Sequence, residues 1–325
     1  MTRVHPIRRL GLPAALTLLL SLGLAGPSPA EQVYLPGAKP AIPPKDSTLT
    51  ITVRPLAPGA YAAKVNTVWT GWVELPDGIL VVDATMADSA GAALADTIRA
   101  RSPGKPFEYL VLTSAHLDHI TGAPRFLGAG ARLVAQASVA DEIDSTLGIT
   151  PDSAKEIRVK NRERLGTAAE PVDVVWLGRD AASRGDLVVW LPKQRILYGG
   201  DLVTNRSVPW LMDRDFDADG WIASIDSLFT KAFAIDTVVP GHGDIGSANQ
   251  ALNFTKYYIQ DARKKASEYA AWNASVLAVK QWGYLGAYEG LEFYDEIHWM
   301  NMRRLYWEAK GIKTPGRGRV SAIRK

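Results

Sequence analysis

The stretch Leu110-Val111-Leu112-Thr113-Ser114-Ala115-His116-Leu117-Asp118-His119-Ile120-Thr121-Gly122 is an apolar run that ends in two histidines and a carboxylate. The apolar part indicates a buried strand, with the polar side chains following at its end. Imidazole and carboxylate groups placed in this way are common ligands of a catalytic divalent metal. The alternative is that Asp118 caps a turn while the histidines are ordinary surface residues. The whole chain has only five histidines and two lie here, which favours a metal site.

Two later apolar runs also end in side chains that can bind metals, next to glycines. The run from Ile196 ends in Gly199, Gly200 and Asp201, and the run from Thr237 ends in His242 between two glycines. Glycine lets the backbone turn tightly, so side chains from separate strands can converge. Five residues of this kind are therefore expected in one cleft: His116, Asp118, His119, Asp201 and His242.

The first 30 residues have the features of a secretory signal peptide. A basic start is followed by an apolar run from Leu10 to Gly26 and by small residues before a cleavage-like site at Ala30. A membrane anchor is the alternative, but the run is short and contains Pro13. We therefore predict export to the periplasm or the medium, with no stable membrane anchor after cleavage. The sequence has no cysteine, which excludes disulfides and thiolate metal ligands.

The net charge argues against a nucleic-acid partner. Removing the three arginines of residues 1–30 from the 37 basic residues leaves 34, equal to the 34 acidic residues. The basic balance of the full chain thus comes mainly from the signal segment, and no nucleic-acid partner is expected. The sequence does not indicate an oligomeric state.

The rest of the chain divides by composition. Residues 31–47 are rich in proline and indicate a linker, residues 48–245 a layered α/β domain, residues 246–310 helices packed on it, and residues 311–325 a basic tail. Strands occur in two batches with helices between and after them, which predicts two sheets covered by helices. The highly charged residues 151–165 are expected to form a helical excursion that overhangs the site.

In combination, these motifs resemble the metallo-β-lactamase superfamily. The resemblance runs in order over roughly residues 50–245 and includes Asn66 and the strand from Gly78 to Asp83. It implies a four-layer αββα sandwich with metal ions in a cleft at one edge of the two sheets.

The sequence departs from the pattern of this family at two positions. Ser114 stands where the first histidine of His-x-His-x-Asp-His is usual, and Ala182 stands where a later histidine is expected. The resemblance therefore implies one ion, most simply zinc with iron or manganese as alternatives. Its implied ligands are Asp118, His119, Asp201 and His242. Asp180 or Ser114 could replace a missing ligand only in part.

The resemblance implies a metal-dependent hydrolase of esters, thioesters, lactones or similar small substrates. Asp118 and His116 are the expected catalytic residues, and Asp83 and Ser114 are expected to support the ligands from outside. A true β-lactamase is not expected, because the family's one-zinc subclass uses a cysteine ligand. Two alternatives stay open: a degenerate member that binds a ligand or partner in the former cleft, and an ion that only staples the sheets.

Overall fold

The computed structural model describes residues 49–150 and 155–312. The predicted signal peptide 1–30, the linker 31–47 and nearly all of the tail 311–325 lie outside the described residues. Near the start of the described residues, antiparallel strands are joined by turns at Pro58-Gly59 and around Asp77.

The strands of the first half of the chain lie side by side in the order β1-β2-β3-β4-β5-β6-β7. β4, β5, β6 and β7 are mutually parallel, whereas β1 to β4 pair antiparallel. Their bounds are β1 Ile51–Ala57, β2 Ala60–Val65, β3 Val68–Glu74, β4 Ile79–Val82, β5 Phe107–Val111, β6 Arg132–Gln136 and β7 Glu156–Val159.

The strands of the second half lie in the order β12-β11-β10-β9-β8, with the short β13 against β12. The two halves join where His242 of β12 pairs with Val68 of β3. Their bounds are β8 Arg162–Gly166, β9 Pro171–Trp176, β10 Leu187–Leu191, β11 Ile196–Asn205, β12 Thr237–Gly243 and β13 Gly246–Ser247.

Alternating side chains of the strands supply three hydrophobic layers. Leu110 of β5 faces the helices of the first half, whereas Val111 faces the opposite sheet. In β11, Leu197 faces the helices of the second half and Tyr198 faces inward. This period of two is the pattern of a sheet buried on both faces, and it produces the predicted αββα sandwich.

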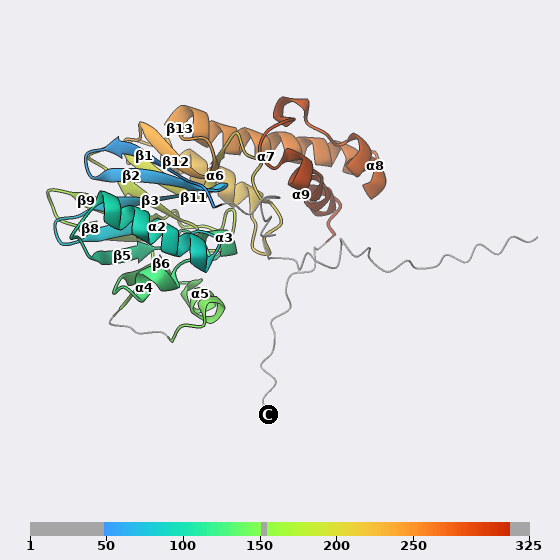
Figure 1. The fold of residues 1–325 in the computed structure, drawn as a ribbon. Coiled ribbons are helices and arrows are strands. Elements are labelled where there is room, and N and C mark those ends of the chain that lie inside the picture. Colours follow the sequence, from blue (N-terminus) through green and yellow to red (C-terminus); the bar gives the residue numbers. More distant parts are fainter. Residues whose placement is uncertain (1–48, 151–154, 313–325) are drawn as a thin grey trace, which may run out of the picture. The chain divides into compact units, whose positions relative to one another are not determined.

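Helices cover both outer faces of the sandwich (Figure 1). On the first sheet lie α2 Asp88–Arg101, α4 Pro124–Leu127 and α5 Ala140–Leu147, and the short α3 Leu117–Ile120 carries the central motif. On the second lie α6 Ala218–Leu228 and α7 Ala248–Ala271. α9 Tyr294–Ala309 packs on α7, α8 Val276–Trp282 packs on α9, and the 3-10 turn Gly286–Tyr288 lies between α8 and α9 in the sequence. Ser247 begins α7 with a capping box in which Gln250 returns the hydrogen bond. The predicted C-terminal helices are therefore present.

The prediction of a helix over residues 151–165 is wrong where the structure describes that segment. Residues 156–159 and 162–166 form β7 and β8, the two ends of the strand order. Arg162 and Arg164 bind the buried carboxylate of Asp173 on the neighbouring β9, at 2.5 and 2.8 Å. These cross-strand ion pairs stabilise β8, and charged side chains are typical of edge strands.

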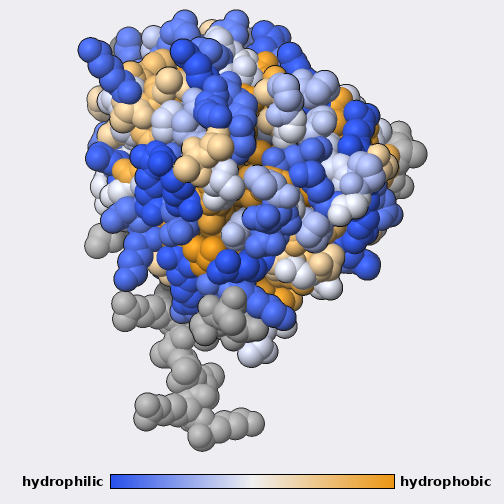
Figure 2. Space-filling view, turned by 90° about the vertical axis from the view of Figure 1, so that its left-hand side faces the viewer, coloured by the Kyte–Doolittle hydropathy of each residue, from blue (hydrophilic) through white to orange (hydrophobic). Residues whose placement is uncertain are grey.

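Figure 2 shows one face of the molecule as mainly hydrophilic, with small hydrophobic patches between charged side chains. Within residues 49–150 and 155–312, none of the helices combines the length and the apolar character needed to cross a bilayer.

Candidate metal centre

The ends of several strands meet at one edge of the sandwich and deliver the predicted site residues. β5 leads into the loop and short helix that carry His116, Asp118 and His119, while β11 carries Asp201 and β12 carries His242. The backbones of β11 and β12 approach closely here: a Cβ added to Gly241 would lie 2.8 Å from the carbonyl carbon of Gly200. Glycine is needed at this position so that the two strands can place their polar side chains together.

Asp118, His119 and His242 form a group whose possible ligand atoms all lie within 4.8 Å of one another. Nε2 of His242 is 3.2 Å from Oδ2 of Asp118. All three side chains are buried. The structure therefore brings together three of the four residues predicted to hold an ion.

Asp201, the fourth predicted ligand, lies against both histidines of this group. Its Oδ1 is 3.2 Å from Nε2 of His119 and 3.3 Å from Nε2 of His242. Its other oxygen, Oδ2, is 2.6 Å from Nδ1 of His116. Asp201 thus connects the Asp-His-His group to the remaining histidine.

The chemistry and spacing of these four residues fit a small divalent cation. Ligands at about 2.0 Å from a tetrahedral zinc ion lie about 3.3 Å apart, close to the three separations above. Nε2 of His119 is buried and makes no hydrogen bond of good geometry among the described residues. Burial lowers the pKa of His119, but Asp201, Asp83 and Asp118 outweigh it and raise the pKa well above its usual value. The buried carboxylates therefore require a compensating positive charge, which a bound cation would supply.

Asp83 supports His119 from the side away from the other ligands. Its Oδ2 lies 2.8 Å from Nδ1 of His119 and also accepts from Oγ1 of Thr113, while its Oδ1 accepts from the Thr113 amide. Asp83 is 1% exposed and adopts a left-handed backbone conformation, with φ of 61°. This geometry is that of a carboxylate which orients a ligand histidine.

His116 is held between two carboxylates. Its Nδ1 pairs with Asp201 and its Nε2 lies 3.2 Å from Oδ2 of Asp213. Burial by itself lowers the pKa of His116, but these two hydrogen bonds outweigh it and raise the pKa to about 10. His116 also lines two small cavities.

Of the two departing positions, Ala182 has no ligand atom to offer. Oγ of Ser114 accepts a hydrogen bond from the amide of His116 at 3.3 Å. Ala182 lies in the wall of a cavity together with His116, Asp201 and His242. Trp210 and Trp221, which follow Asp201 in the sequence, also line this cavity and make that side of it apolar.

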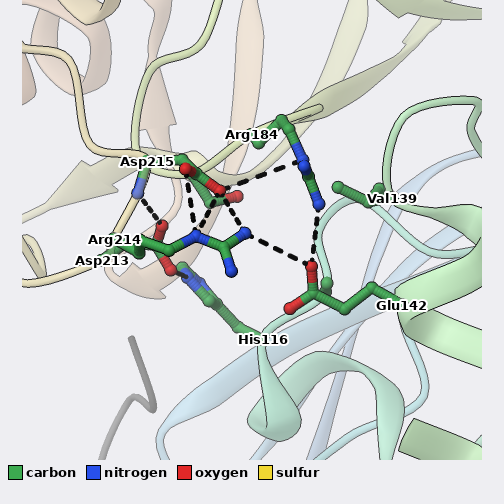
Figure 3. A pocket seen from close by; sticks show the side chains of 9 residues that line it. His116, Val139, Glu142, Arg184, Asp213, Arg214 and Asp215 are labelled. Carbon is green, nitrogen blue, oxygen red and sulfur yellow. Dashed lines mark hydrogen bonds and ion pairs between the residues drawn. The ribbon is translucent and has the colours of Figure 1, made fainter. Parts of the chain in front are cut away.

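A second cavity above His116 contains residues that the sequence analysis did not select. Figure 3 shows Glu142, Arg184, Asp213, Arg214 and Asp215 around it. Asp213 was missed because its contact with His116 spans 97 positions in the sequence. The only available signal was the run Asp213-Arg214-Asp215, which is charged although it follows an apolar segment.

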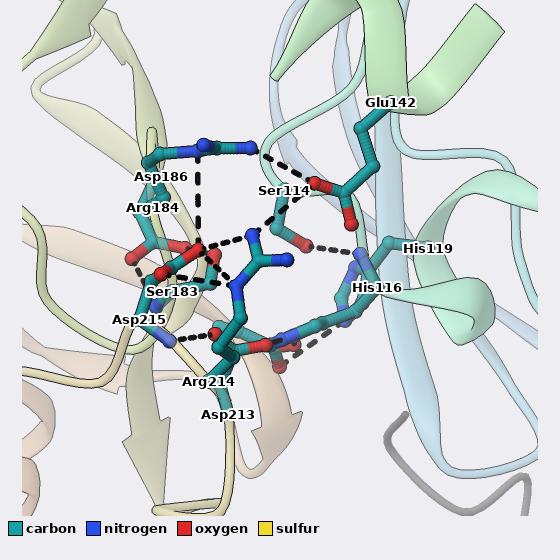
Figure 4. Close-up of polar contacts among 11 residues, drawn as sticks. Ser114, His116, His119, Glu142, Ser183, Arg184, Asp186, Asp213, Arg214 and Asp215 are labelled. Atoms are coloured by element: carbon teal, nitrogen blue, oxygen red, sulfur yellow. Dashed lines mark hydrogen bonds and ion pairs between the residues drawn. The ribbon is translucent and has the colours of Figure 1, made fainter. Parts of the chain in front are cut away.

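Asp186 is a buried carboxyl near this second cavity. Its two oxygens accept hydrogen bonds from the amide and the hydroxyl of Ser183, each at 2.7 Å (Figure 4). Burial raises the pKa of Asp186 to about 7 against the opposing effect of these hydrogen bonds. Asp186 therefore holds the turn that leads from Ala182 into β10.

Comparison with known proteins agrees with this architecture. A chain of Bacillus cereus described as metallo-beta-lactamase type 2 is 25% identical over 182 residues, which cover 54% of this chain and 67% of that protein. Among solved structures, a metallo-beta-lactamase from Pontibacter korlensis matches with a TM-score of 0.55 at 19% identity, covering 65% of this chain and 99% of its own. A sec-alkylsulfatase from Pseudomonas sp. matches with a TM-score of 0.61 at 14% identity, covering 81% of this chain and 51% of its own.

These structural likenesses are too low in identity to establish more than the fold. The family model of the metallo-beta-lactamase superfamily matches residues 63–242, more than half of the chain, and this range ends at the last histidine of the group. Together with the αββα sandwich and the clustered Asp-His-His group, this match identifies the family. The chain belongs to the metallo-beta-lactamase superfamily.

Proposed function

We propose that this protein is an exported metal-dependent hydrolase with one ion, acting on an ester, thioester, lactone or similar small substrate. The observation that supports it most is the group of Asp118, His119 and His242 beside Asp201, buried at the edge of the sandwich and next to two cavities. The absence of cysteine and the alanine at position 182 argue against a true β-lactamase.

The proposed ligands of the ion are Asp118, His119, Asp201 and His242. Imidazole with carboxylate suits zinc, and iron and manganese are the alternatives. A bound cation would supply Lewis-acid polarisation of the substrate carbonyl and would lower the pKa of water at the site.

The side chains of the chain itself then have separate roles. The carboxylate of Asp118 takes a proton from the attacking water as a general base. His116, held between Asp201 and Asp213, lines the cavities and, as a hydrogen-bond donor, stabilises negative charge that develops on the substrate oxygen. For this, Nε2 of His116 exchanges Asp213 for the substrate oxygen. Asp83 keeps Nε2 of His119 directed at the ion.

A second candidate function is that of a binding protein that has lost catalysis. It is favoured by two observations: both ring nitrogens of His116 are occupied by carboxylates, and Ala182 supplies no ligand atom. In this case the cleft would bind a ligand that is not turned over.

The test is a hydrolysis screen with p-nitrophenyl acetate, an acyl thioester, a simple lactone and benzylpenicillin, before and after removal of metal with a chelator. We expect chelator-sensitive turnover of at least one of the first three that returns with added zinc. The Asp118→Ala variant should lose this activity by at least 100-fold, whereas Asp88→Ala, an exposed acid on α2, should retain it. Turnover of benzylpenicillin alone would contradict the substrate class, and no turnover with normal metal binding would favour the binding protein.

Export is part of the proposal and has its own test. Expression of the full chain in a bacterium should give a mature protein that begins at Glu31 and lies outside the cytoplasm. Intact-mass measurement of the fractionated protein checks this. A cytoplasmic product that retains residues 1–30 would contradict it.

A further inference from the structure

The mouth of the cavity above His116 is formed by two arginines and two acids from opposite sides of the site. Glu142 comes from α5 on the first half of the molecule, whereas Arg184, Arg214 and Asp215 come from loops of the second half (Figure 4). The walls of the same cavity include His116. A substrate that reaches His116 through this cavity must pass these four side chains.

The two guanidinium groups converge on one carboxylate oxygen. Oε2 of Glu142 is 3.0 Å from Nη2 of Arg184 and 3.8 Å from Nη2 of Arg214 (Figure 3). Arg214 is also bound by its neighbour Asp215, with Nη2 at 2.6 Å and Nε at 3.1 Å from Asp215 oxygens. Asp215 is in turn fixed by Asp213, whose Oδ1 accepts from its amide at 2.8 Å. Asp215 therefore anchors Arg214 from the same loop, whereas Glu142 reaches Arg214 only from across the cleft.

We infer that Arg184 and Arg214 form a subsite for an anionic group of the substrate (a carboxylate, sulfate or phosphate), and that Glu142 occupies this subsite in the absence of substrate. The inference rests on the proposed function in that the substrate is that of the hydrolase. The planar guanidinium group of arginine can donate two parallel hydrogen bonds to the oxygens of such an anion. In this structure both guanidinium groups contact a single oxygen of Glu142, so other N–H donors of the two arginines can bind a further acceptor oxygen.

The energetics permit such an exchange. The side chains of Arg184 and Glu142 are 36% and 40% exposed, and ion pairs of this exposure are weak. Glu142 lies on the short helix α5 and can turn into water without disturbing the core. The charge also balances: two arginines are matched by Asp215 and Glu142 in the closed state, and by Asp215 and the substrate anion in the open one.

The rival explanation is that Glu142 and the arginines only latch the two halves of the cleft together. The two explanations predict opposite effects of one substitution. If the arginines receive an anion, Glu142→Gln removes a competitor and strengthens anion binding. If the four residues only latch the two halves together, Glu142→Gln lowers the affinity for the anion, as Arg184→Gln and Arg214→Gln do.

The experiment is calorimetric titration of the mature protein with benzoate, benzenesulfonate and phenyl phosphate, with benzyl alcohol as the neutral probe. We expect at least one anion to bind with a Kd at least 10-fold lower than that of benzyl alcohol, and the three anions identify which oxyanion is preferred. Arg184→Gln and Arg214→Gln should each raise the Kd at least 10-fold, and Glu142→Gln should lower it at least 3-fold. Arg195→Gln, which removes an exposed pair with Asp236 at the start of β11, is the matched control and should leave the Kd unchanged.

Arg184→Lys and Arg214→Lys retain the charge without the fork and should give intermediate affinities, which guards against a variant that fails to fold. No anion binding, equal affinities in all variants, or weaker binding in Glu142→Gln would overturn the subsite. Because the titration does not require turnover, anion binding without hydrolysis would remove the hydrolase proposal and leave the subsite. Hydrolysis of esters with no preference for charged over neutral ones in the wild type would remove only the subsite.

Discussion

Asp83 fixes the tautomer of His119. The carboxylate oxygen Oδ2 of Asp83 can only accept, so Nδ1 of His119, 2.8 Å away, carries a hydrogen, and the lone pair of the neutral ring that binds an ion is on Nε2, on the side of Asp201 and Asp118. Two hydrogen bonds from Thr113 hold the Asp83 carboxylate itself. Asp83, which directly follows β4, thus orients the proposed metal ligand His119.

Asp83→Asn is expected to weaken metal binding 10- to 100-fold while the protein stays folded. Asparagine tolerates the left-handed backbone at this position, but its amide can present a donor to Nδ1 of His119 and so favour the wrong tautomer. Competition with a chromophoric chelator measures the affinity. Asp88→Asn, an exposed change on α2, serves as the control, and an Asp83→Asn affinity equal to that of the wild type would refute the orienting role.

Asn301 of α9 holds the loop that leads to Asp213. Its Oδ1 accepts from the amide of Leu211 at 3.0 Å, and its Nδ2 donates to the carbonyl of Pro209 at 2.7 Å and to the hydroxyl of Tyr258 at 3.0 Å. Asn301 is fully buried. The C-terminal helices therefore contribute to the placement of a residue that contacts His116.

Asn301→Ala is expected to lower the free energy of unfolding by about 3 kcal/mol, because buried polar groups lose their partner. Urea denaturation measures it. Asn253→Ala, in an exposed hydrogen bond along α7, should cost less than about 0.5 kcal/mol. Equal effects of the two substitutions would show that the hydrogen bonds of Asn301 do not contribute to the free energy of unfolding.

Asp186 predicts a dependence of stability on pH. Its pKa is about 7 in the folded protein and 3.8 as the usual value, so the folded state holds a proton that the unfolded state releases. The stabilising contribution of the protonated carboxyl is complete below pH 3.8 and is lost as the pH rises to about 7, on the order of 1 kcal/mol per pH unit.

Asp186→Asn should remove this dependence, so the variant gains stability relative to the wild type between pH 5 and about 7. Unfolding free energies of both proteins at intervals of half a pH unit measure the difference. Parallel curves for the two proteins would contradict a titration of Asp186 in this range.

Much of the fold could be predicted from the sequence because it depends on local patterns. The strand 132–136 and the runs that lead to Asp201 and His242 have apolar residues bounded by glycine or polar residues, and the structure places strands there, although β11 continues past Asp201 to Asn205. Residues 156–166 were misassigned because charged side chains outnumber the few apolar ones, and because Asp173, which binds Arg162 and Arg164 of β8, lies on another strand. Edge strands with this composition carry little apolar signal.

The candidate site was predictable only in part. His116, Asp118, His119, Asp201 and His242 could be selected since they are metal-type residues at strand ends, and the structure brings them together. Asp213 and the four residues at the cavity mouth could not, because surface-type charges acquire a role only when the loops of the two halves face each other. The roles of the selected residues as ligands and catalytic groups stay predictions.

The central claim is a single metal ion held by Asp118, His119, Asp201 and His242. Elemental mass spectrometry of the mature protein purified without chelators tests it most directly, with Asp118→Ala and His242→Ala beside the wild type and His298→Ala as a control, because His298 is a buried histidine of α9 outside the site. We predict about one ion per chain in the wild type and the control, and loss of the ion in the two site variants. About two ions per chain would show that other residues replace the ligands missing at Ser114 and Ala182, and no ion in a folded wild type would contradict the claim.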